Sequence, residues 1–255
     1  MSIVSIFNQK GGVGKTTTAV NLLAALARRG RNPYGIDLDP QAQFSAISGV
    51  RAADGDATVL ALFQRNRPLR ELIAATNTGG CIIPAHLELS KVDTLFGKGY
   101  NIVNRLNTAL RAEHFSDDAR PVLIDCSPLI GVLTLNAIFA CDGLIIPISA
   151  DHLSARAALQ TEKTLKALEV VLKRRVPRRF LLTRFDTRRR MAWEIHHMLE
   201  EKFGADVCRV KIAENVSLAE SPAHNMTVFQ HAPNSRGAQD YDALLDELLA
   251  DGFLA

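Results

Sequence analysis

The sequence has few cysteines, few aromatic residues and no long apolar run. Its four cysteines are widely separated and form no CxxC pair, which argues against a disulfide framework or a zinc site and favours reduced thiols. The longest apolar runs, such as Gly143–Ile148, are far shorter than the roughly 20 residues that span a bilayer. Residues 1–12 contain no basic region followed by a cleavage site, so we expect no secretory signal and a cytoplasmic protein.

The composition is that of a folded protein. Apolar residues make up 47% of the 255 residues and charged residues 22%, which argues against disorder. A chain of this length buries a sizeable core. Since it shows no internal repeat and no linker, we predict a single domain over residues 1–255.

The net charge of +3 conceals a concentrated basic stretch. Nine basic residues stand between Lys173 and Arg190 against one acid, Asp186, whereas the remainder carries 21 basic and 26 acidic residues. One interpretation is a polyanion partner met at one place, and the other is a solvated helix end and loop. The charge count leaves both open.

Short apolar segments alternate with helical patterns along the chain. Strands are expected at Ser2–Phe7, Asn32–Leu38, Cys81–Pro84, Pro121–Cys126, Gly143–Ile148, Arg179–Thr183 and Val207–Ile212. Helices are expected at Lys15–Arg29, Val59–Ala75, Asn101–Ala112, Thr134–Ala140, Leu153–Arg174, Arg190–Phe203 and Ser235–Ala250. This alternation predicts βαβ units, and therefore an α/β fold with a mainly parallel sheet covered by helices on both faces.

A glycine-rich segment, KGGVGKTT at residues 10–17, follows the first expected strand and opens the first expected helix. Its Gly-x-x-Gly-Lys-Thr frame predicts a P-loop, in which backbone N–H groups and the helix N-terminus cradle phosphate oxygens. Lys15 would reach the β and γ oxygens, and the Thr16 hydroxyl would bind Mg²⁺. The predicted cofactors are therefore ATP and Mg²⁺.

Three acids stand where two expected strands end. Asp37 and Asp39 belong to the segment DLDPQ, and Asp125 follows the apolar run Val122–Ile124 in a Walker B pattern. Parallel strands deliver their C-terminal ends to the ligand crevice, so Asp39 is expected to face the γ-phosphate and orient water. Asp125 would hold Mg²⁺ directly or through water, and Asp37 would support the metal shell. Any one of these acids could instead be a helix cap or turn residue, but their order along the chain favours a catalytic site.

Lys10, before the first glycine, makes the segment resemble the deviant Walker A box, KGGxGKT, of the ParA/MinD family of P-loop ATPases. In that family the early lysine reaches the phosphates of the other protomer. The resemblance implies that Lys10, Lys15 and Asp39 are catalytic. The ATP-binding residues it implies in the loop are Lys10, Gly11, Gly12, Val13, Gly14, Lys15, Thr16 and Thr17.

The resemblance to ParA proteins covers most of the chain, including IDCSP, LTLNA, LLTRFDTRRR, ENVSLAESPAHNMTV and SRGAQDYDALLDEL. The P-loop begins within the first ten residues, which is similar to the short ParA type without an N-terminal helix-turn-helix. The family implies a doubly wound fold, an ATP-bound homodimer and DNA binding without sequence preference. It further implies a ParB-like activating partner, weak basal hydrolysis, a nucleoid-associated location, and partition of a plasmid, a chromosome or another cargo.

The chain also departs from the family pattern. Ala42 and Ser127 replace a usual glycine and proline, and Ile212–Ser217 lacks the arginines that bind DNA in typical members. The DNA-binding role would then pass to Arg178, Arg179, Arg188, Arg189 and Arg190. Arg184, Ala213 and Glu214 resemble the adenine-side segments of MinD-like members and are the expected base contacts.

Three alternative functions compete with DNA partition. A MinD-like membrane-cycling ATPase needs a basic amphipathic C-terminal helix, whereas Gln239–Ala255 contains five acids and no basic residue, so we expect no membrane partner. A second alternative is an ATPase that positions a cargo other than DNA. An iron–sulfur protein of the same fold would need paired cysteines, but Cys126 and Cys141 are more typical of buried apolar positions.

Two aromatic features lie on the expected helix Arg190–Phe203. His196 and His197 are adjacent and cannot share one helix face as i, i+4 ligands would, so we expect a solvated surface there. Trp193 lies off the apolar stripe and is expected to pack against a neighbouring loop or to contact a partner.

Overall fold

The computed structural model describes residues 2–97, 99–115 and 119–254, so Met1 and Ala255 of the predicted domain lie outside the described residues. Its centre is a seven-stranded sheet with the order β3-β4-β2-β5-β1-β6-β7. Neighbouring strands pair in parallel except β3 and β4, which are antiparallel. The strands are β1 Ile3–Ile6, β2 Tyr34–Leu38, β3 Ala74–Ala75, β4 Cys81–Ile83, β5 Val122–Cys126, β6 Gly143–Ser149 and β7 Arg178–Thr183.

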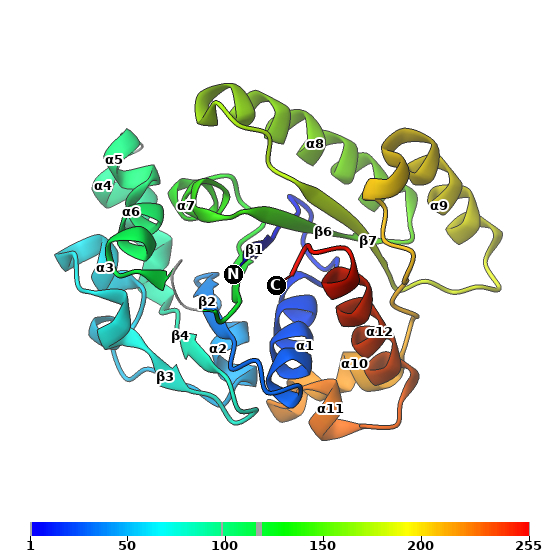
Figure 1. Ribbon diagram of the computed structural model, residues 1–255, viewed down its shortest axis with the longest axis horizontal. Coiled ribbons are helices and arrows are strands. Elements are labelled where there is room, and N and C mark those ends of the chain that lie inside the picture. Colours follow the sequence, from blue (N-terminus) through cyan, green and yellow to red (C-terminus); the bar gives the residue numbers. More distant parts are fainter. Residues whose placement is uncertain (1, 98, 116–118, 255) are drawn as a thin grey trace.

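Helices cover both faces of the sheet (Figure 1). The helices are α1 Lys15–Arg28, α2 Gln43–Ile47, α3 Leu60–Arg65, α4 Val92–Phe96, α5 Tyr100–Val103, α6 Arg105–Ala112, α7 Val132–Ala140, α8 His152–Leu172, α9 Arg190–Phe203, α10 Val216–Glu220, α11 Val228–His231 and α12 Arg236–Ala250. Helices α1, α2 and α12 pack on one face, and α7, α8 and α9 pack on the other. Because both faces are covered, β1, β2 and β5 are buried along their whole length, and the predicted α/β fold is confirmed.

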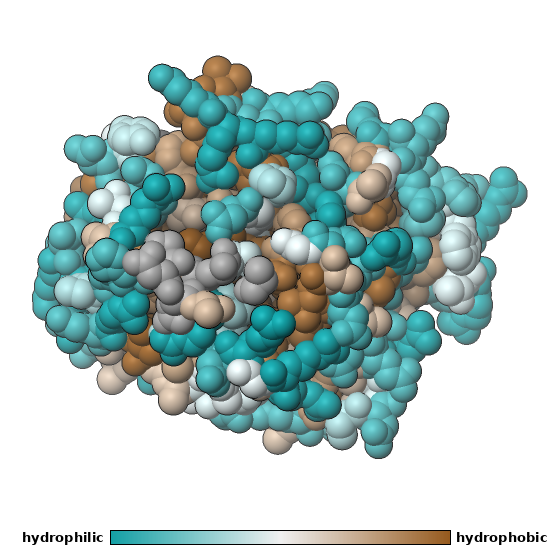
Figure 2. Space-filling view, in the orientation of Figure 1, coloured by the Kyte–Doolittle hydropathy of each residue, from teal (hydrophilic) through white to brown (hydrophobic). Residues whose placement is uncertain are grey.

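The strand register places three strand ends together. Ile6 at the end of β1 lies opposite Asp125 of β5, and Asp37 of β2 also lies opposite Asp125. The segments that follow β1, β2 and β5 therefore leave the sheet at one edge, where ligands bind in open parallel sheets. Around this core, hydrophilic side chains cover most of the face seen in Figure 2, with apolar side chains showing in patches between them.

The predicted helix Val59–Ala75 is wrong over most of its length. Helix α3 ends at Arg65, Asn66 adopts a left-handed conformation with φ 54°, and a short 3₁₀ turn follows at Leu69–Leu72 before β3. Pro68 explains the break, because proline donates no hydrogen bond and disfavours the helical conformation of the residue before it. The expected helix Asn101–Ala112 is likewise divided, into α5 and α6.

The predicted strand Val207–Ile212 is also wrong, although the segment lies beside β7. Cys208 N–H donates to the Phe180 carbonyl and Ile212 N–H to the Leu182 carbonyl. Between them, the N–H groups of Arg209 and Val210 donate to the Glu247 carboxylate of α12, each at 2.8 Å. This side chain replaces a strand partner, so no continuous ladder forms.

Nowhere in the described ranges is a helix both long and apolar enough to cross a membrane.

Candidate functional site

The glycine-rich loop joins β1 to α1 through residues with positive φ angles, which glycine adopts readily and other residues rarely do. Gly12 and Gly14 have φ angles of 75° and 90°. Gly14 caps α1 without any side-chain hydrogen bond from the described residues, so the first N–H groups of the helix remain available to an anion. The Thr183 hydroxyl of β7 donates to the Val13 carbonyl at 2.9 Å and fixes the loop from outside.

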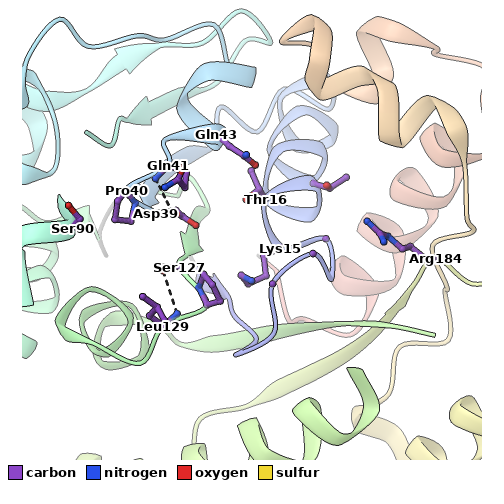
Figure 3. Close-up of a pocket in the computed structure, with 15 residues that line it drawn as sticks. Lys15, Thr16, Asp39, Pro40, Gln41, Gln43, Ser90, Ser127, Leu129 and Arg184 are labelled. Atoms are coloured by element: carbon purple, nitrogen blue, oxygen red, sulfur yellow. Dashed lines mark hydrogen bonds between the residues drawn. The ribbon is translucent and has the colours of Figure 1, made fainter. Parts of the chain in front are cut away.

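A cavity of about 510 Å³ opens above this loop. The loop with Lys15 and Thr16 forms one wall, and Asp39–Gln41 and Ser127–Leu129 form the other (Figure 3). Figure 3 shows the side chains of Lys15, Asp39 and Ser127 around the same space, with Arg184 on the other side of the loop. The structure therefore brings together predicted residues that stand more than twenty positions apart in the sequence.

Asp125, just before Cys126 at the end of β5, is fully buried, and neither carboxylate oxygen accepts a hydrogen bond of good geometry from the described residues. Burial raises its pKa well above the usual range, and the nearby Asp37 carboxylate adds to the rise, while the Thr16 hydroxyl and the Lys15 ammonium oppose it. A buried carboxylate without a partner is costly unless a cation compensates it. Oxygen ligands from Asp125 and Thr16 suit Mg²⁺, so these are the residues that would hold the ion. When bound, Mg²⁺ polarises phosphoryl oxygens and offsets their charge.

Asp37 has a different environment from Asp125. Its Oδ1 accepts a hydrogen bond from Asp39 N–H at 3.0 Å, and its Oδ2 accepts from the N–H and hydroxyl of Ser45 at 2.9 and 2.6 Å. The Ser45 hydroxyl oxygen in turn accepts from Ala85 N–H at 3.0 Å. Burial raises the pKa of Asp37, although these hydrogen bonds oppose the rise. Both oxygens of Asp37 therefore hold the backbone at Asp39 and the start of α2, and its expected role in supporting the metal shell stays a prediction.

The two lysines of the loop face different neighbours. Lys15 is buried, and its ammonium donates a hydrogen bond to the Lys10 carbonyl at 3.0 Å. Burial lowers the pKa of Lys15, although the negative charge of Asp125 acts to raise it. Lys10 instead extends to the N-terminus of α8, where it contacts Asp151 and Ser154. Although burial acts in the opposite direction, hydrogen bonds from Ser154 and Lys10 hold the pKa of Asp151 well below its usual range.

A second cavity, of about 320 Å³, adjoins the loop on the side of β7. The expected base contacts Arg184, Ala213 and Glu214 all line it, together with Gly14 and Thr17 of the loop. Helix α12 holds the part of the wall that contains Ala213, because the Asp240 carboxylate accepts a hydrogen bond from Ala213 N–H at 2.8 Å. A group that extends from the first cavity past Gly14 would therefore enter this space.

Several residues of these two cavities escaped the sequence interpretation. Ser127 and Gln43 line the first cavity, and Leu218 and Tyr241 line the second. The Tyr241 hydroxyl lies 3.2 Å from the Thr18 hydroxyl of α1. No local pattern marks Leu218 and Tyr241, because they reach the second cavity from α10 and α12, about 200 positions beyond the glycine-rich loop.

The basic stretch divides into two groups at opposite ends of β7. Arg178 begins this strand, whereas Arg188–Arg190 follow the turn beyond its last residue, Thr183. A six-residue strand separates the groups by roughly 20 Å. The stretch therefore does not form one continuous surface.

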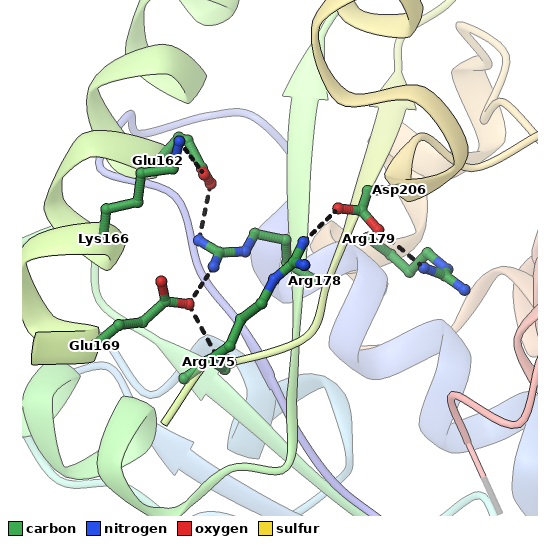
Figure 4. A network of polar contacts seen from close by, with 8 residues as sticks. Glu162, Lys166, Glu169, Arg175, Arg178, Arg179 and Asp206 are labelled. Carbon is green, nitrogen blue, oxygen red and sulfur yellow. Dashed lines mark hydrogen bonds and ion pairs between the residues drawn. The ribbon is translucent and has the colours of Figure 1, made fainter. Parts of the chain in front are cut away.

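Arg178 does not have the accessible position that DNA binding requires. Its side chain is 3% exposed and lies between the carboxylates of Glu162 and Glu169 of α8 (Figure 4). Arg179 is partly buried and pairs with Asp206 and Asp251 at 3.5 Å each. The expectation of DNA contact is corrected for Arg178, because the two glutamates already occupy its guanidinium.

The second group is open to solvent. Arg188 and Arg190 are 88% and 93% exposed, and Arg189 is 58% exposed. Each lies beside an acid: Arg188 pairs with Asp186, Arg189 with Asp186 and Glu214, and Arg190 with Glu194. The pair between Arg189 and Glu214, at 3.2 Å, joins this group to the wall of the second cavity.

The remaining predictions concern cysteines and α9. Cys126 and Cys141 are fully buried, and burial raises the pKa of both thiols, which agrees with an apolar packing role. Trp193 packs its ring 5.1 Å from that of Phe185 and donates to the Thr187 carbonyl at 3.0 Å, so the loop-packing interpretation is correct. The expectation of a solvated histidine pair is wrong for His196, which is buried, and correct for His197, which is exposed.

Comparisons with known proteins cover most of the chain. A family model described as an AAA domain matches residues 1–177. The chromosome-partitioning ATPase Soj of Thermus thermophilus is 36% identical over 248 residues, covering 97% of this chain and 95% of that protein. The sporulation initiation inhibitor protein Soj of Bacillus subtilis is 32% identical over 252 residues, covering 98% and 99%. Cobyrinic acid a,c-diamide synthase of Mycobacterium smegmatis, solved with a bound ATP analog and magnesium, superposes with a TM-score of 0.83 at 25% identity, covering 99% and 96% of the two chains.

Proposed function

Because this chain belongs to the Soj/ParA family of P-loop ATPases, we propose that it binds ATP and Mg²⁺ and uses ATP hydrolysis to partition or position DNA. The observation that carries this proposal is geometric. Lys15, Thr16 and the buried carboxylate of Asp125 lie close to one another at one edge of a parallel sheet, beside the loop that presents Asp39. We further propose that residues 1–255 act as one ATPase domain.

In the proposed reaction the protein mainly positions groups and stabilises charge. The N–H groups at the start of α1 and the Lys15 ammonium bind the phosphates, and Thr16 and Asp125 hold the metal ion. Asp39 is partly exposed at the cavity wall, and its Oδ1 accepts from Gln41 N–H at 2.9 Å, which directs the carboxylate. From this place Asp39 orients the attacking water, while Asp37 holds the backbone of Asp39 in position.

The proposed active form is a homodimer in which Lys10 completes the partner's phosphate site. In the single chain Lys10 is engaged by Asp151 and Ser154, so it must exchange these contacts for phosphate oxygens. The exchange has a cost because Asp151 is then left without its cation. We therefore propose a weak basal rate, which an activating adaptor of the ParB type raises by favouring the dimer.

The proposed DNA contact is the exposed group Arg188–Arg190, without base recognition, since guanidinium groups bind phosphates in any sequence. The pair between Arg189 and Glu214 connects this group with the nucleotide cavities, which gives ATP a route to influence it. A two-fold dimer presents two such groups, and coupled patches bind more tightly than one. The protein would then act in the cytoplasm on the nucleoid.

A second candidate is an ATPase that positions a cargo other than DNA. The observation in its favour is that each of Arg188, Arg189 and Arg190 lies beside a carboxylate, which reduces the net positive charge of the group. The membrane-cycling alternative has less support. Helix α12 buries Leu244, Leu245 and Leu248 in the core and therefore offers no apolar face to a bilayer.

The test is DNA binding measured with ATP, with ADP and without nucleotide, over a series of salt concentrations. We expect binding to double-stranded DNA of unrelated sequences with ATP only. The logarithm of affinity should fall with the logarithm of salt concentration, with a slope of about −0.9 per neutralised phosphate. ATP-dependent dimers that bind no DNA at low salt would support the second candidate instead. Absence of ATP binding would contradict the ATPase proposal itself.

A further inference from the structure

Two histidines and a glutamate converge on one turn of α9. The imidazole Nε2 of His196 lies 3.3 Å from Oε1 of Glu200, and Nδ1 of His197 lies 3.7 Å from Oε2 of the same carboxylate. Although the histidines are adjacent in sequence, Glu200 is four residues beyond one and three beyond the other. Both spacings place side chains next to one another on a helix, so the glutamate bridges the two rings.

These separations match the coordination sphere of a metal ion. One donor atom from each of the three residues lies within 4.8 Å of the others, and within the described parts of the chain this is the only such group of three. A tetrahedral ion with bonds of about 2.0–2.1 Å to nitrogen and oxygen requires donor atoms about 3.3–3.5 Å apart. The observed distances of 3.3 and 3.7 Å join the two rings to different oxygens of Glu200, so this exposed carboxylate must turn for one oxygen to share an ion with both imidazoles.

The donor set selects the type of ion. Two imidazole nitrogens with one carboxylate suit zinc and its neighbours among the divalent transition metals, whereas Mg²⁺ prefers oxygen ligands only. Imidazole binds metal in its neutral form. His196 is buried on α9. Its Nδ1 is buried without a partner in the described residues, so metal ligation falls to Nε2, on the side of Glu200.

We propose that His196, His197 and Glu200 form a binding site for a divalent transition-metal ion of the zinc type. Because His197 and Glu200 are exposed, the ion is open to solvent, and water or a ligand from another molecule completes its coordination. The site is on α9 and shares no residue with the phosphate cavity. The other explanation of the same contacts is an ordinary hydrogen-bonded pair along a helix, which binds no metal.

Trp193 provides a direct probe. It is the only tryptophan in the sequence, and its ring lies 5.8 Å from the His196 ring and 6.4 Å from the His197 ring. Cu²⁺ or Ni²⁺ bound at these rings would quench its fluorescence, and Zn²⁺ would compete. The tag-free full chain is titrated with Cu²⁺ and Ni²⁺ in millimolar Mg²⁺, followed by competition with Zn²⁺. We expect saturable quenching at one ion per chain that a molar excess of Zn²⁺ reverses, since Cu²⁺ binds such ligands more tightly than Zn²⁺ does.

Exposed ligands allow variants that leave the core intact. His197→Ala and Glu200→Gln should each weaken binding by more than about tenfold, the loss seen when even an outer partner of a metal ligand is removed. The control His224→Ala, which removes an exposed histidine elsewhere, should bind as the wild type does. Asp125→Asn should also retain quenching, which separates this site from the one proposed for Mg²⁺. Absence of saturable quenching in the wild type, or unchanged binding in both ligand variants, would overturn the proposal.

Discussion

Lys10 of the glycine-rich loop and Asp151 at the start of α8 form an ion pair, with Nζ 2.9 Å from Oδ1. The same ammonium donates to the Ser154 hydroxyl at 2.8 Å, and the Asp151 carboxylate also accepts from Ser154 N–H. These contacts join the glycine-rich loop to helix α8 through two residues that are 141 positions apart in the sequence. Lys10 is thus held by α8, whereas Lys15 lines the phosphate cavity.

Substitution of the two lysines should separate nucleotide binding from dimerisation. We expect Lys15→Ala to abolish ATP binding, because Lys15 lies in its own chain's cavity. Lys10→Ala should bind ATP nearly as well as the wild type but form no ATP-dependent dimer in analytical ultracentrifugation. Normal ATP-dependent dimers of Lys10→Ala would refute the role proposed for Lys10 across the dimer interface.

Asp39→Ala should bind ATP and form dimers but hydrolyse ATP slowly. Loss of the carboxylate that orients water should lower kcat by about 10²–10⁴-fold, with little effect on nucleotide affinity. The rate is measured by phosphate release at saturating ATP. Glu201→Ala, which removes an exposed acid on α9, serves as the control and should keep the wild-type rate. A wild-type rate for Asp39→Ala would remove this residue from the mechanism.

Asp125→Asn should make the protein without metal more stable at high pH. Burial raises the pKa of Asp125 in the native state, so the native state favours the neutral acid. In the unfolded state the pKa of an aspartate is near 4. The fold therefore loses stability as the pH rises from the unfolded-state pKa through the higher native-state pKa. Asparagine imitates the neutral form. We expect a gain of about 1–3 kcal/mol in the free energy of unfolding at pH 8, which shrinks toward pH 4.

Thermal unfolding with and without Mg²⁺ checks this prediction. Mg²⁺ should raise the Tm of the wild type, increasingly at higher pH, and should not raise that of Asp125→Asn. Equal stabilisation of both proteins by Mg²⁺ would place the ion elsewhere.

Replacement of Arg188, Arg189 and Arg190 by glutamate should abolish DNA binding. The expected effect includes a general loss of charge attraction, so a control with the same change in charge is needed. Arg51, Arg65 and Arg111 are exposed in other parts of the chain, and their triple glutamate variant supplies that control. The prediction holds if, with ATP at low salt, the control retains most of its DNA affinity and the first variant does not. Equal affinities would assign DNA contact to another surface.

Arg178→Leu should destabilise the fold. The substitution leaves Glu162 and Glu169 in a largely buried place without their common partner, which costs about 3–5 kcal/mol for such a pair. Arg175→Leu is the matched control, because the Arg175 side chain is 74% exposed and its ion pair with Asp206 should contribute little. The free energies of unfolding are compared by urea denaturation. Similar values for both variants would show that the network in Figure 4 is not needed for stability.

The sequence determined the elements and residues whose signals are local. The loop at residues 10–17, the apolar strand before it and the helix after it follow from glycine spacing and from hydrophobic periodicity. Strand ends in a parallel sheet point to one edge, so the places of Asp39 and Asp125 followed from their positions alone. Pro68 is likewise a local signal for the end of α3, because proline disfavours the helical conformation of the residue before it.

Only the tertiary structure decided which distant groups meet. It turned Arg178 inward between two glutamates of α8, and it placed Glu247 against the N–H groups of Arg209 and Val210 where a strand was expected. It also buried His196 beside Glu200 and engaged Lys10 with Asp151. The physical reason is that periodicity and turn chemistry act over a few residues. The burial and partner of a charged side chain depend instead on segments that pack against it from tens or hundreds of positions away.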